Sequence, residues 1–156
     1  MKKNLLIIFL IYISVNAYTQ TNSTIIKVVK SKTVNQILPG ACQLQEYLPL
    51  LKDKRVAVFA NQTSLIVNTH LVDTLKKLGI NITKIFGPEH GFRGNADAGE
   101  TVKTYTDKET GISVISLYGS KLKPAPADLA DVDILLFDIQ DVGVRFYTFI
   151  SSLQYF

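Results

Sequence analysis

The sequence predicts an α/β fold with a mostly parallel sheet and helices on both faces. Short apolar runs that suit buried strands alternate along the chain with segments of helical spacing, and this alternation is typical of parallel sheets. An apolar content of 47% and a charged content of 19% in 156 residues suit one globular domain and exclude a disordered chain. The single cysteine, Cys42, excludes an intramolecular disulfide and a cysteine-based zinc cluster.

Four apolar segments are predicted to form the strands of this sheet. Residues 55–60 are a compact apolar run of the kind found in strands buried on both faces. Residues 80–86 carry more polar side chains and are therefore expected to form a less central strand. Residues 112–117 and 133–139 complete the set.

Three segments before and between the strands have helical character. Residues 43–51 predict a short helix, and Pro49 is expected to keep it from continuing regularly. Residues 69–78 carry leucines at helical spacing and are followed by Gly79, a residue type that often terminates helices. Residues 127–131 predict a further short helix.

The first 17 residues have the pattern of a secretory signal peptide. Two lysines precede an apolar run over residues 5–15, and Ala17 ends a small-residue cleavage motif. A membrane-spanning helix needs about 20 residues, so we expect a secreted or periplasmic location with no stable membrane insertion after cleavage. Residues 18–40 predict a linker or edge segment, and residues 41–156 predict the domain itself.

The basic isoelectric point does not indicate a nucleic-acid partner. The chain has 17 basic and 13 acidic side chains, and Lys2 and Lys3 lie in the expected signal peptide. From Arg55 onward the sequence holds 10 basic and 11 acidic side chains. The predicted domain therefore lacks the positive excess that attracts phosphates.

The turn after the second predicted strand concentrates groups suited to chemistry. Such sheets bind ligands at the carboxyl ends of their strands, and residues 87–94 there read GPEHGFRG. A long polar loop at this place seldom serves packing alone, so we expect a binding loop that presents Glu89, His90 and Arg93. The alternative is an ordinary turn with solvated charges. The glycine spacing fits neither a dinucleotide fingerprint nor a P-loop, and no cofactor is expected.

The turn after the fourth predicted strand adds further candidates. Asp138 ends the strand, and Gln140 and Asp141 follow it. Two residues separate the acids, whereas phosphatase-like sites use Asp-x-Asp, and a chain with two histidines offers few ligands to a transition metal. No metal is assigned. A Mg²⁺ or Ca²⁺ site at the two aspartates and a buried Asp138 that caps the turn stay open as alternatives.

Three long motifs resemble the exo-β-N-acetylmuramidases of bacterial cell-wall recycling: GPEHGFRG followed by AGE, DKETGISVISLYG, and DILLFDIQDVGVRFYTF. The similarity runs from about Leu38 to the last residue. It implies a secreted or periplasmic glycosidase that releases N-acetylmuramic acid from the non-reducing ends of peptidoglycan fragments. It also implies a Rossmann-like N-terminal domain, a smaller C-terminal domain, and an active site in the cleft between them. Glu89, the glutamate of GPEHG, is then the leading catalytic carboxylate.

The resemblance also predicts that this chain is a fragment. Family members are more than twice as long, and the sequence stops at Phe156 inside an apolar segment of helical character. We therefore expect a missing C-terminal domain that packs on this one. Activity is expected of the longer protein rather than of this chain alone.

Glycoside hydrolysis needs an acid that protonates the departing oxygen and a second group that supplies or stabilises a nucleophile. Glu89 suits the first role. Four candidates suit the second role: Asp138, Asp141, a residue of the missing domain, or the substrate's own 2-acetamido group. The competing hypotheses are a non-catalytic module that binds cell-wall glycans and a metal-dependent phosphoryl-transfer domain. The predicted substrate-binding residues are His90, Arg93, Asn61, Gln140, Arg145 and Tyr118.

An arginine is the expected reader of the lactyl carboxylate that distinguishes N-acetylmuramic acid, because a guanidinium binds a carboxylate through two hydrogen bonds. Arg145 precedes an expected helix start at Phe146, where free backbone N–H groups also favour an anion. Arg93 lies four residues after Glu89 and can instead tune that acid.

Overall fold

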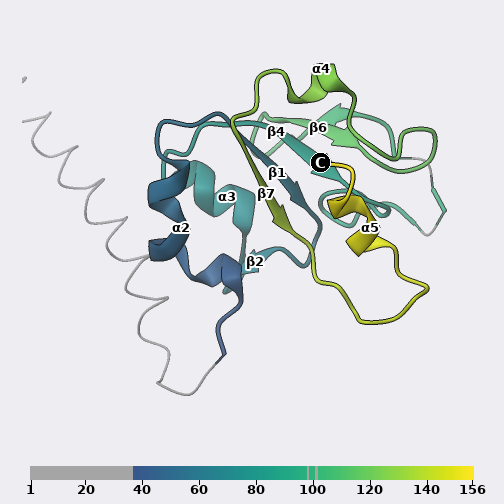
Figure 1. Cartoon of the computed structure of the whole chain (residues 1–156), viewed down its shortest axis with the longest axis horizontal. Coiled ribbons are helices and arrows are strands. Elements are labelled where there is room, and N and C mark those ends of the chain that lie inside the picture. Colours follow the sequence, from purple (N-terminus) through teal and green to yellow (C-terminus); the bar gives the residue numbers. More distant parts are fainter. Residues whose placement is uncertain (1–36, 98, 101) are drawn as a thin grey trace, which may run out of the picture.

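The computed structural model describes residues 37–97, 99–100 and 102–156, and the predicted signal peptide lies outside them. A five-stranded sheet in the order β5-β6-β4-β1-β7 forms its centre (Figure 1). Four of these strands are parallel, and β5 is antiparallel to β6. Their bounds are β1 Val56–Ala60, β4 Ile82–Gly87, β5 Tyr105–Thr106, β6 Ser113–Ser116 and β7 Ile134–Asp138. The predicted mostly parallel α/β sheet is confirmed.

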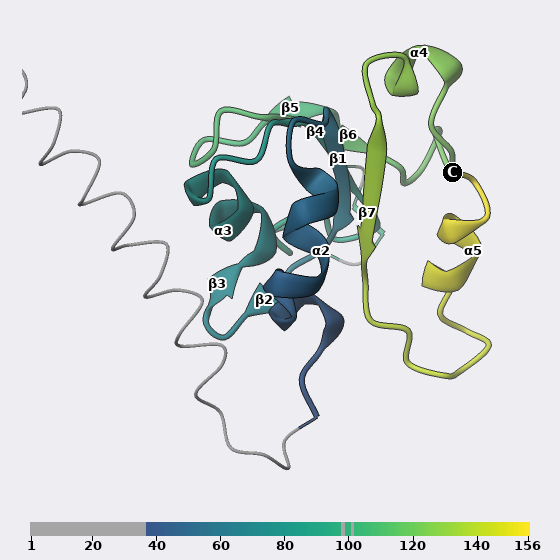
Figure 2. The same ribbon diagram turned by 60° about the vertical axis from the view of Figure 1, so that its left-hand side comes forward.

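Helices cover both faces of the sheet. α2 (Leu44–Leu51) and α3 (Leu71–Lys77) lie on one side, and α5 (Phe149–Leu153) lies on the other (Figure 2). The short α4 (Pro126–Leu129) contributes Leu129 to the core on the α5 side. In the described part of the chain, no helix combines the length and the apolar character that a membrane crossing requires.

Side chains of β1 alternate between two cores. Val56, Val58 and Ala60 face the core under α2 and α3, whereas Ala57 and Phe59 face the other one. The second core is rich in aromatic rings: Phe59 stacks on Phe137 at 4.9 Å between ring centroids and lies 5.5 Å from Phe156. All five residues of β1 are fully buried, as expected for a strand packed on both faces.

The prediction that residues 80–86 form a less central strand is wrong. β4 is the middle strand of the five-stranded sheet. Its polar residues are accommodated near its beginning, where Lys84 forms an ion pair with Asp131. Ile85 and Phe86 near its end are fully buried.

The first helix agrees with the sequence prediction to within one residue, and one further boundary differs. Pro49 lies inside α2, two residues before its end, so that the helix lacks one backbone donor in its last turn but is not interrupted. α3 begins at Leu71 rather than at residue 69, because Thr69 and His70 form β3 (Thr69–His70), which pairs with β2 (Leu65–Ile66) in a small hairpin. Gly79 adopts φ +81° directly after the helix, in agreement with its predicted role as a stop.

Candidate active site

A cleft of about 370 Å³ lies at the carboxyl ends of β1, β4 and β7. The chain places β4 and β6 on one side of β1 and then crosses over to place β7 on the other. In open α/β sheets, ligands bind outside the strand ends at such a switch in direction. The turns after the three strands supply the lining, which consists of Asn61, Gln62, Thr63, Glu89, His90, Gln140, Val142, Phe146, Tyr147, Thr148 and Phe149.

Four of the predicted site residues line this cleft together: Glu89, His90, Asn61 and Gln140. They come from three turns that are far apart in the sequence but adjacent in the sheet. Asp141 and Arg145 are exposed in the loop after β7 and are not part of the lining. The strand-end rule therefore predicted residues that line one cleft together, whereas Asp141 and Arg145 lie outside that lining.

Glu89 is held by groups from two neighbouring segments. The Gly99 backbone N–H donates to Glu89 Oε1 at 3.2 Å. The Glu89 carboxylate also lies close to the Tyr118 hydroxyl and, together with desolvation, raises the pKa of Tyr118. Tyr118, predicted to bind substrate, thus contacts the candidate catalytic carboxylate. The Gly99 bond holds one carboxylate oxygen of Glu89 in place.

His90 occupies an uncommon backbone conformation beside Glu89. Its φ is +67°, a left-handed value that costs a non-glycine residue of this kind about 1 kcal/mol or more and that clusters at functional sites. His90 Nδ1 lies 3.1 Å from the Ala96 carbonyl oxygen. Because a carbonyl only accepts, Nδ1 carries a proton, and Nε2 is the nitrogen left for a ligand.

Arg93 is engaged by acidic side chains rather than by Glu89. Its guanidinium donates to both carboxylate oxygens of Asp107 at 2.8 Å each, and to those of Asp73 at 2.9 and 3.1 Å. It also lies 4.7 Å from the centre of the Phe92 ring. These contacts tie the loop after β4 to α3 and to the turn before β6. The geometry thus favours a structural role for Arg93 over the predicted role in substrate binding.

Asp138 lies at the end of β7, below the cleft. Its Oδ2 atom is buried and has no hydrogen-bond partner among the described residues, and burial raises the pKa of this carboxyl. The Ser64 hydroxyl donates to the main-chain oxygen of Asp138. Asp138 is therefore partly buried, as one alternative predicted, but no hydrogen bond joins its carboxylate to the described residues of the following turn.

The sequence analysis missed an apolar wall on one side of the cleft. Val142, Phe146, Tyr147 and Phe149 form it, and Phe146 is 94% exposed. The expected helix start at Phe146 is wrong, because α5 begins at Phe149. Residues 142–148 instead form a loop, and the helix terminus that was expected to support Arg145 is absent from that position. Four apolar residues in this segment, which forms neither strand nor helix, were the signal available in the sequence.

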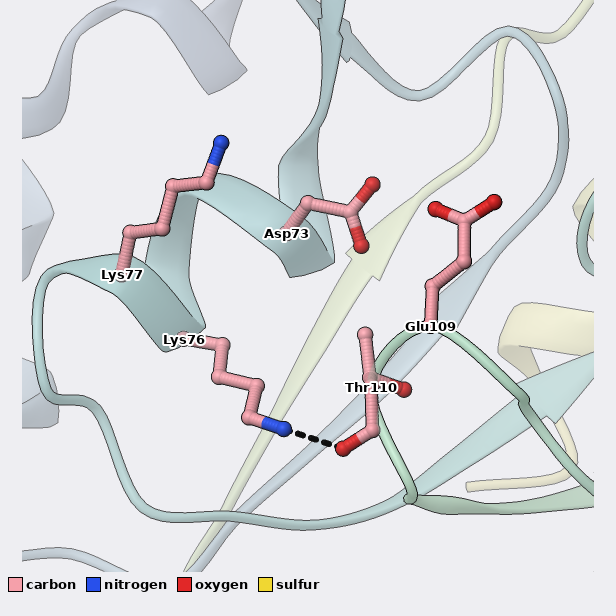
Figure 3. Close-up of a pocket in the computed structure, with 5 residues that line it drawn as sticks. All are labelled: Asp73, Lys76, Lys77, Glu109 and Thr110. Atoms are coloured by element: carbon pink, nitrogen blue, oxygen red, sulfur yellow. Dashed lines mark hydrogen bonds between the residues drawn. The ribbon is translucent and has the colours of Figure 1, made fainter.

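Acidic groups do not gather into a metal site in the described residues, where no three His, Cys, Asp or Glu side chains are placed to hold an ion. A second hollow of about 410 Å³ lies between α3 and the turn before β6 (Figure 3). There Lys76 donates to the Thr110 carbonyl, with Asp73 and Glu109 nearby. This contact holds the same turn that supplies Asp107 to Arg93, which indicates a structural role for the hollow.

The fold and the cleft define an α/β domain that presents a carboxylate at the switch point of its sheet. Residues 56–156 match the family of the N-terminal domain of exo-beta-N-acetylmuramidase NamZ. This match covers well over half of the chain. The chain therefore belongs to the NamZ N-terminal domain family.

Three relatives agree with this assignment. The chain is 48% identical over 116 residues to the peptidoglycan beta-N-acetylmuramidase NamZ of Bacillus subtilis (strain 168). The aligned region covers 72% of this chain and 28% of the relative. Two crystal structures of DUF1343 family proteins from Bacteroides fragilis NCTC 9343 are also similar. One is 46% identical with a TM-score of 0.59, covering 72% of this chain and 28% of that one. The other is 37% identical with a TM-score of 0.64, covering 74% and 29%. The chain thus spans less than a third of the length of these relatives.

The ion pairs of Arg93 predict a loss of stability when the guanidinium is removed. We expect Arg93→Met to lower the free energy of unfolding at pH 7 by about 3 kcal/mol, because it leaves two largely buried carboxylates unpaired. Urea unfolding measures the change. Arg55→Met is the matched control: its pair with Asp133 is exposed, with side chains 47% and 35% accessible, and such pairs contribute at most about 1 kcal/mol.

The same variant should change the acid sensitivity of the protein. Arg93 lowers the pKa of Asp107 to about 2, so the stabilisation is complete above about pH 4 and is lost as the pH falls towards 2. Arg93→Met should flatten the stability profile across this interval. If the variant is as stable as the wild type at both ends of this pH interval but the full-length protein binds substrate less tightly, Arg93 binds the substrate instead.

Proposed function

We propose that the full-length protein carrying this chain is an exo-β-N-acetylmuramidase, a glycosidase that releases N-acetylmuramic acid from the non-reducing ends of peptidoglycan fragments. Membership of the NamZ N-terminal family and the name of the Bacillus subtilis relative support this proposal. The observation that carries it is the placement of Glu89 in a cleft whose two walls differ in chemistry.

The cleft is well suited to a sugar ring. Its polar wall offers the amides of Asn61, Gln62 and Gln140, and its apolar wall offers the rings of Phe146 and Tyr147. A pyranose has hydroxyl and amide groups around its rim and C–H groups on its faces, so it can contact both walls at once. The volume of about 370 Å³ lies in the range of about 300–1,000 Å³ typical of small-molecule sites.

Glu89 is the carboxylate to which we assign the reaction. It is the acidic residue among the described residues that line the cleft; Asp138 is partly buried below it, and Asp141 is exposed outside it. The arrangement therefore favours the substrate's 2-acetamido group, or a residue outside this chain, as the second group that the chemistry requires. Asp138 is the first alternative within the chain.

Another part of the full-length protein is expected to complete the cleft. Several apolar side chains of the last segment are exposed beside it, including Phe146, Ile150 and Leu153. Apolar surface of this extent commonly marks a contact with another domain or protein. We propose that the C-terminal domain expected from the family resemblance packs there.

The role of Glu89 predicts a large loss of turnover in Glu89→Gln, which keeps the shape of the side chain but cannot exchange a proton. Removal of a general acid or base lowers rates by about 10²–10⁴-fold, and we expect a loss of kcat in this range with an unchanged melting temperature. Release of N-acetylmuramic acid from peptidoglycan fragments by the full-length protein is the measurement. Glu46→Gln, an exposed change on α2, is the matched control.

Two outcomes would count against this assignment. If Glu89→Gln keeps turnover within about threefold of the wild type, the role passes to Asp138. If the wild type binds the fragments but releases no sugar, the domain is a non-catalytic glycan-binding module.

Recognition of the lactyl carboxylate is the proposed role of Arg145. Its side chain is exposed in the loop that carries the apolar wall. A charged hydrogen bond contributes about 1.5–3 kcal/mol, so Arg145→Ala should lower kcat/KM about ten- to a hundredfold on substrates with the lactyl group. Substrates that lack this group should be spared. An equal loss on both kinds of substrate would mean that Arg145 shapes the cleft rather than reads the carboxylate.

We also propose that the protein is exported to a secreted or periplasmic location. The basic start, the short apolar run and the small-residue motif ending at Ala17 support this proposal. Mass spectrometry of the exported protein should find an N-terminus close to Tyr18. A membrane-retained product that still begins at Met1 would contradict it.

A further inference from the structure

We infer that Asn61 is a specificity-determining residue of the cleft, whose side-chain amide donates hydrogen bonds to a carbonyl or carboxylate oxygen of the bound sugar. The inference rests on the proposed function, because it names atoms of that substrate. The inference goes beyond the proposed function because it names the hydrogen-bond donor, the orientation of the Asn61 amide and the groups that hold Asn61 in place.

The orientation of the Asn61 amide follows from its contacts. Asn61 Oδ1 accepts hydrogen bonds from the Thr63 backbone N–H at 3.0 Å and from the Thr63 hydroxyl at 2.7 Å. A backbone N–H can only donate, so the atom that faces it must be the oxygen. The Nδ2 group therefore lies on the opposite side of the amide plane. The two N–H bonds of this group are the donors that the inference uses.

These donors have no partner in the described part of the chain. No hydrogen bond joins Asn61 Nδ2 to another described residue, although Asn61 is only 3% exposed. The described side-chain atoms that are buried without a partner are Ser116 Oγ and Asp138 Oδ2, and Asn61 Nδ2 is not among them. Asn61 lines the cleft, and its donors are assigned to that space.

The backbone of Asn61 is fixed on both sides. Its N–H donates to Ser64 Oγ at 3.2 Å, and the Ser64 hydroxyl in turn donates to the main-chain oxygen of Asp138. Its carbonyl lies 2.9 Å from His70 Nε2. His70 Nδ1 accepts from the Val72 N–H at 3.2 Å, which places the ring proton on Nε2, where it is donated to Asn61.

This network makes Asn61 a donor that is oriented before any ligand arrives. It connects the turn after β1 to the end of β7 and to the start of α3. His70 also contacts Phe92 of the loop after β4, with 4.4 Å between ring centroids. A donor held in this way loses little conformational entropy on binding, which increases its contribution to affinity and specificity.

The acceptor that fits is an sp² oxygen. N-acetylmuramic acid carries two groups with such oxygens, the 2-acetamido carbonyl and the lactyl carboxylate. Both groups accept hydrogen bonds from an amide. The choice of sugar in the experiment distinguishes the acetamido carbonyl from the lactyl carboxylate.

The test compares Asn61→Asp with the wild type in the full-length protein. The aspartate keeps an oxygen for Thr63 but replaces both donors by an acceptor. We expect kcat/KM on an N-acetylmuramic acid glycoside to fall at least tenfold, mainly through KM, with an unchanged melting temperature. Gln45→Glu, an exposed amide-to-acid change on α2, is the matched control. If Asn61→Asp does not fold, Asn61→Ser is used, because a serine hydroxyl can still accept from the Thr63 N–H.

Calorimetric titration with three free sugars identifies the acceptor: N-acetylmuramic acid, N-acetylglucosamine without the lactyl group, and muramic acid with a free 2-amino group. If the variant's defect disappears without the lactyl group, Asn61 reads the carboxylate. If it disappears without the acetyl group, Asn61 reads the acetamido carbonyl. An equal defect on all three, or no defect on any, overturns the inference.

Calorimetric titration with free N-acetylmuramic acid separates this inference from the proposed function. If the wild type binds the sugar but releases none from substrates, the function fails, and a tenfold weaker affinity of Asn61→Asp still supports the inference. If the wild type releases the sugar and the variant matches it in both assays, the inference fails and the function stands. A wild type that neither binds nor releases the sugar overturns both.

Discussion

The hydrogen bond from His70 to the carbonyl of Asn61 is the interaction on which the geometry of the cleft depends. The imidazole joins the turn after β1, the first turn of α3 and, through Phe92, the loop after β4. Burial lowers the pKa of His70, and Arg93 adds to this effect, whereas the bond to Asn61 and the charges of Asp73 and Asp138 oppose it. The neutral ring is required, because Nδ1 must accept the Val72 N–H.

Burial differs strongly between individual residues of the cleft. Asn61 is almost completely buried, and His70 behind it is 8% exposed, whereas Phe146 on the other side is 94% exposed. Asn61 is therefore held in place by the fold. The apolar wall gains free energy only when its rings are covered, which makes it the part of the cleft most dependent on a ligand or on another part of the protein.

The sequence predicted the sheet, and it predicted candidate residues that the sheet brings into one cleft, because both depend on local patterns. Apolar runs identify strands, and the strand-end rule brought Glu89, His90, Asn61 and Gln140 together. Sequence analysis gave less where the environment of a side chain depends on a residue far away in the sequence. Arg93 was assigned to the substrate because Asp73 and Asp107, which are 20 and 14 residues away, are not visible as its partners in a linear pattern. The central position of β4 was missed for the same reason, since Lys84 pairs with Asp131 across 47 residues.

Two arginines near the strand ends illustrate how charge is divided in this domain. Arg93 is surrounded by carboxylates, and its charge is used to fix the loop that carries Glu89 and His90. Arg145 is exposed in the loop that carries the apolar wall. A guanidinium already bound by two carboxylates has few donors left for an anionic ligand, because it has five N–H groups in a fixed plane. The donors of this domain to which we assign recognition of the proposed substrate are therefore the amide of Asn61, which lines the cleft, and the guanidinium of Arg145, which lies outside its lining.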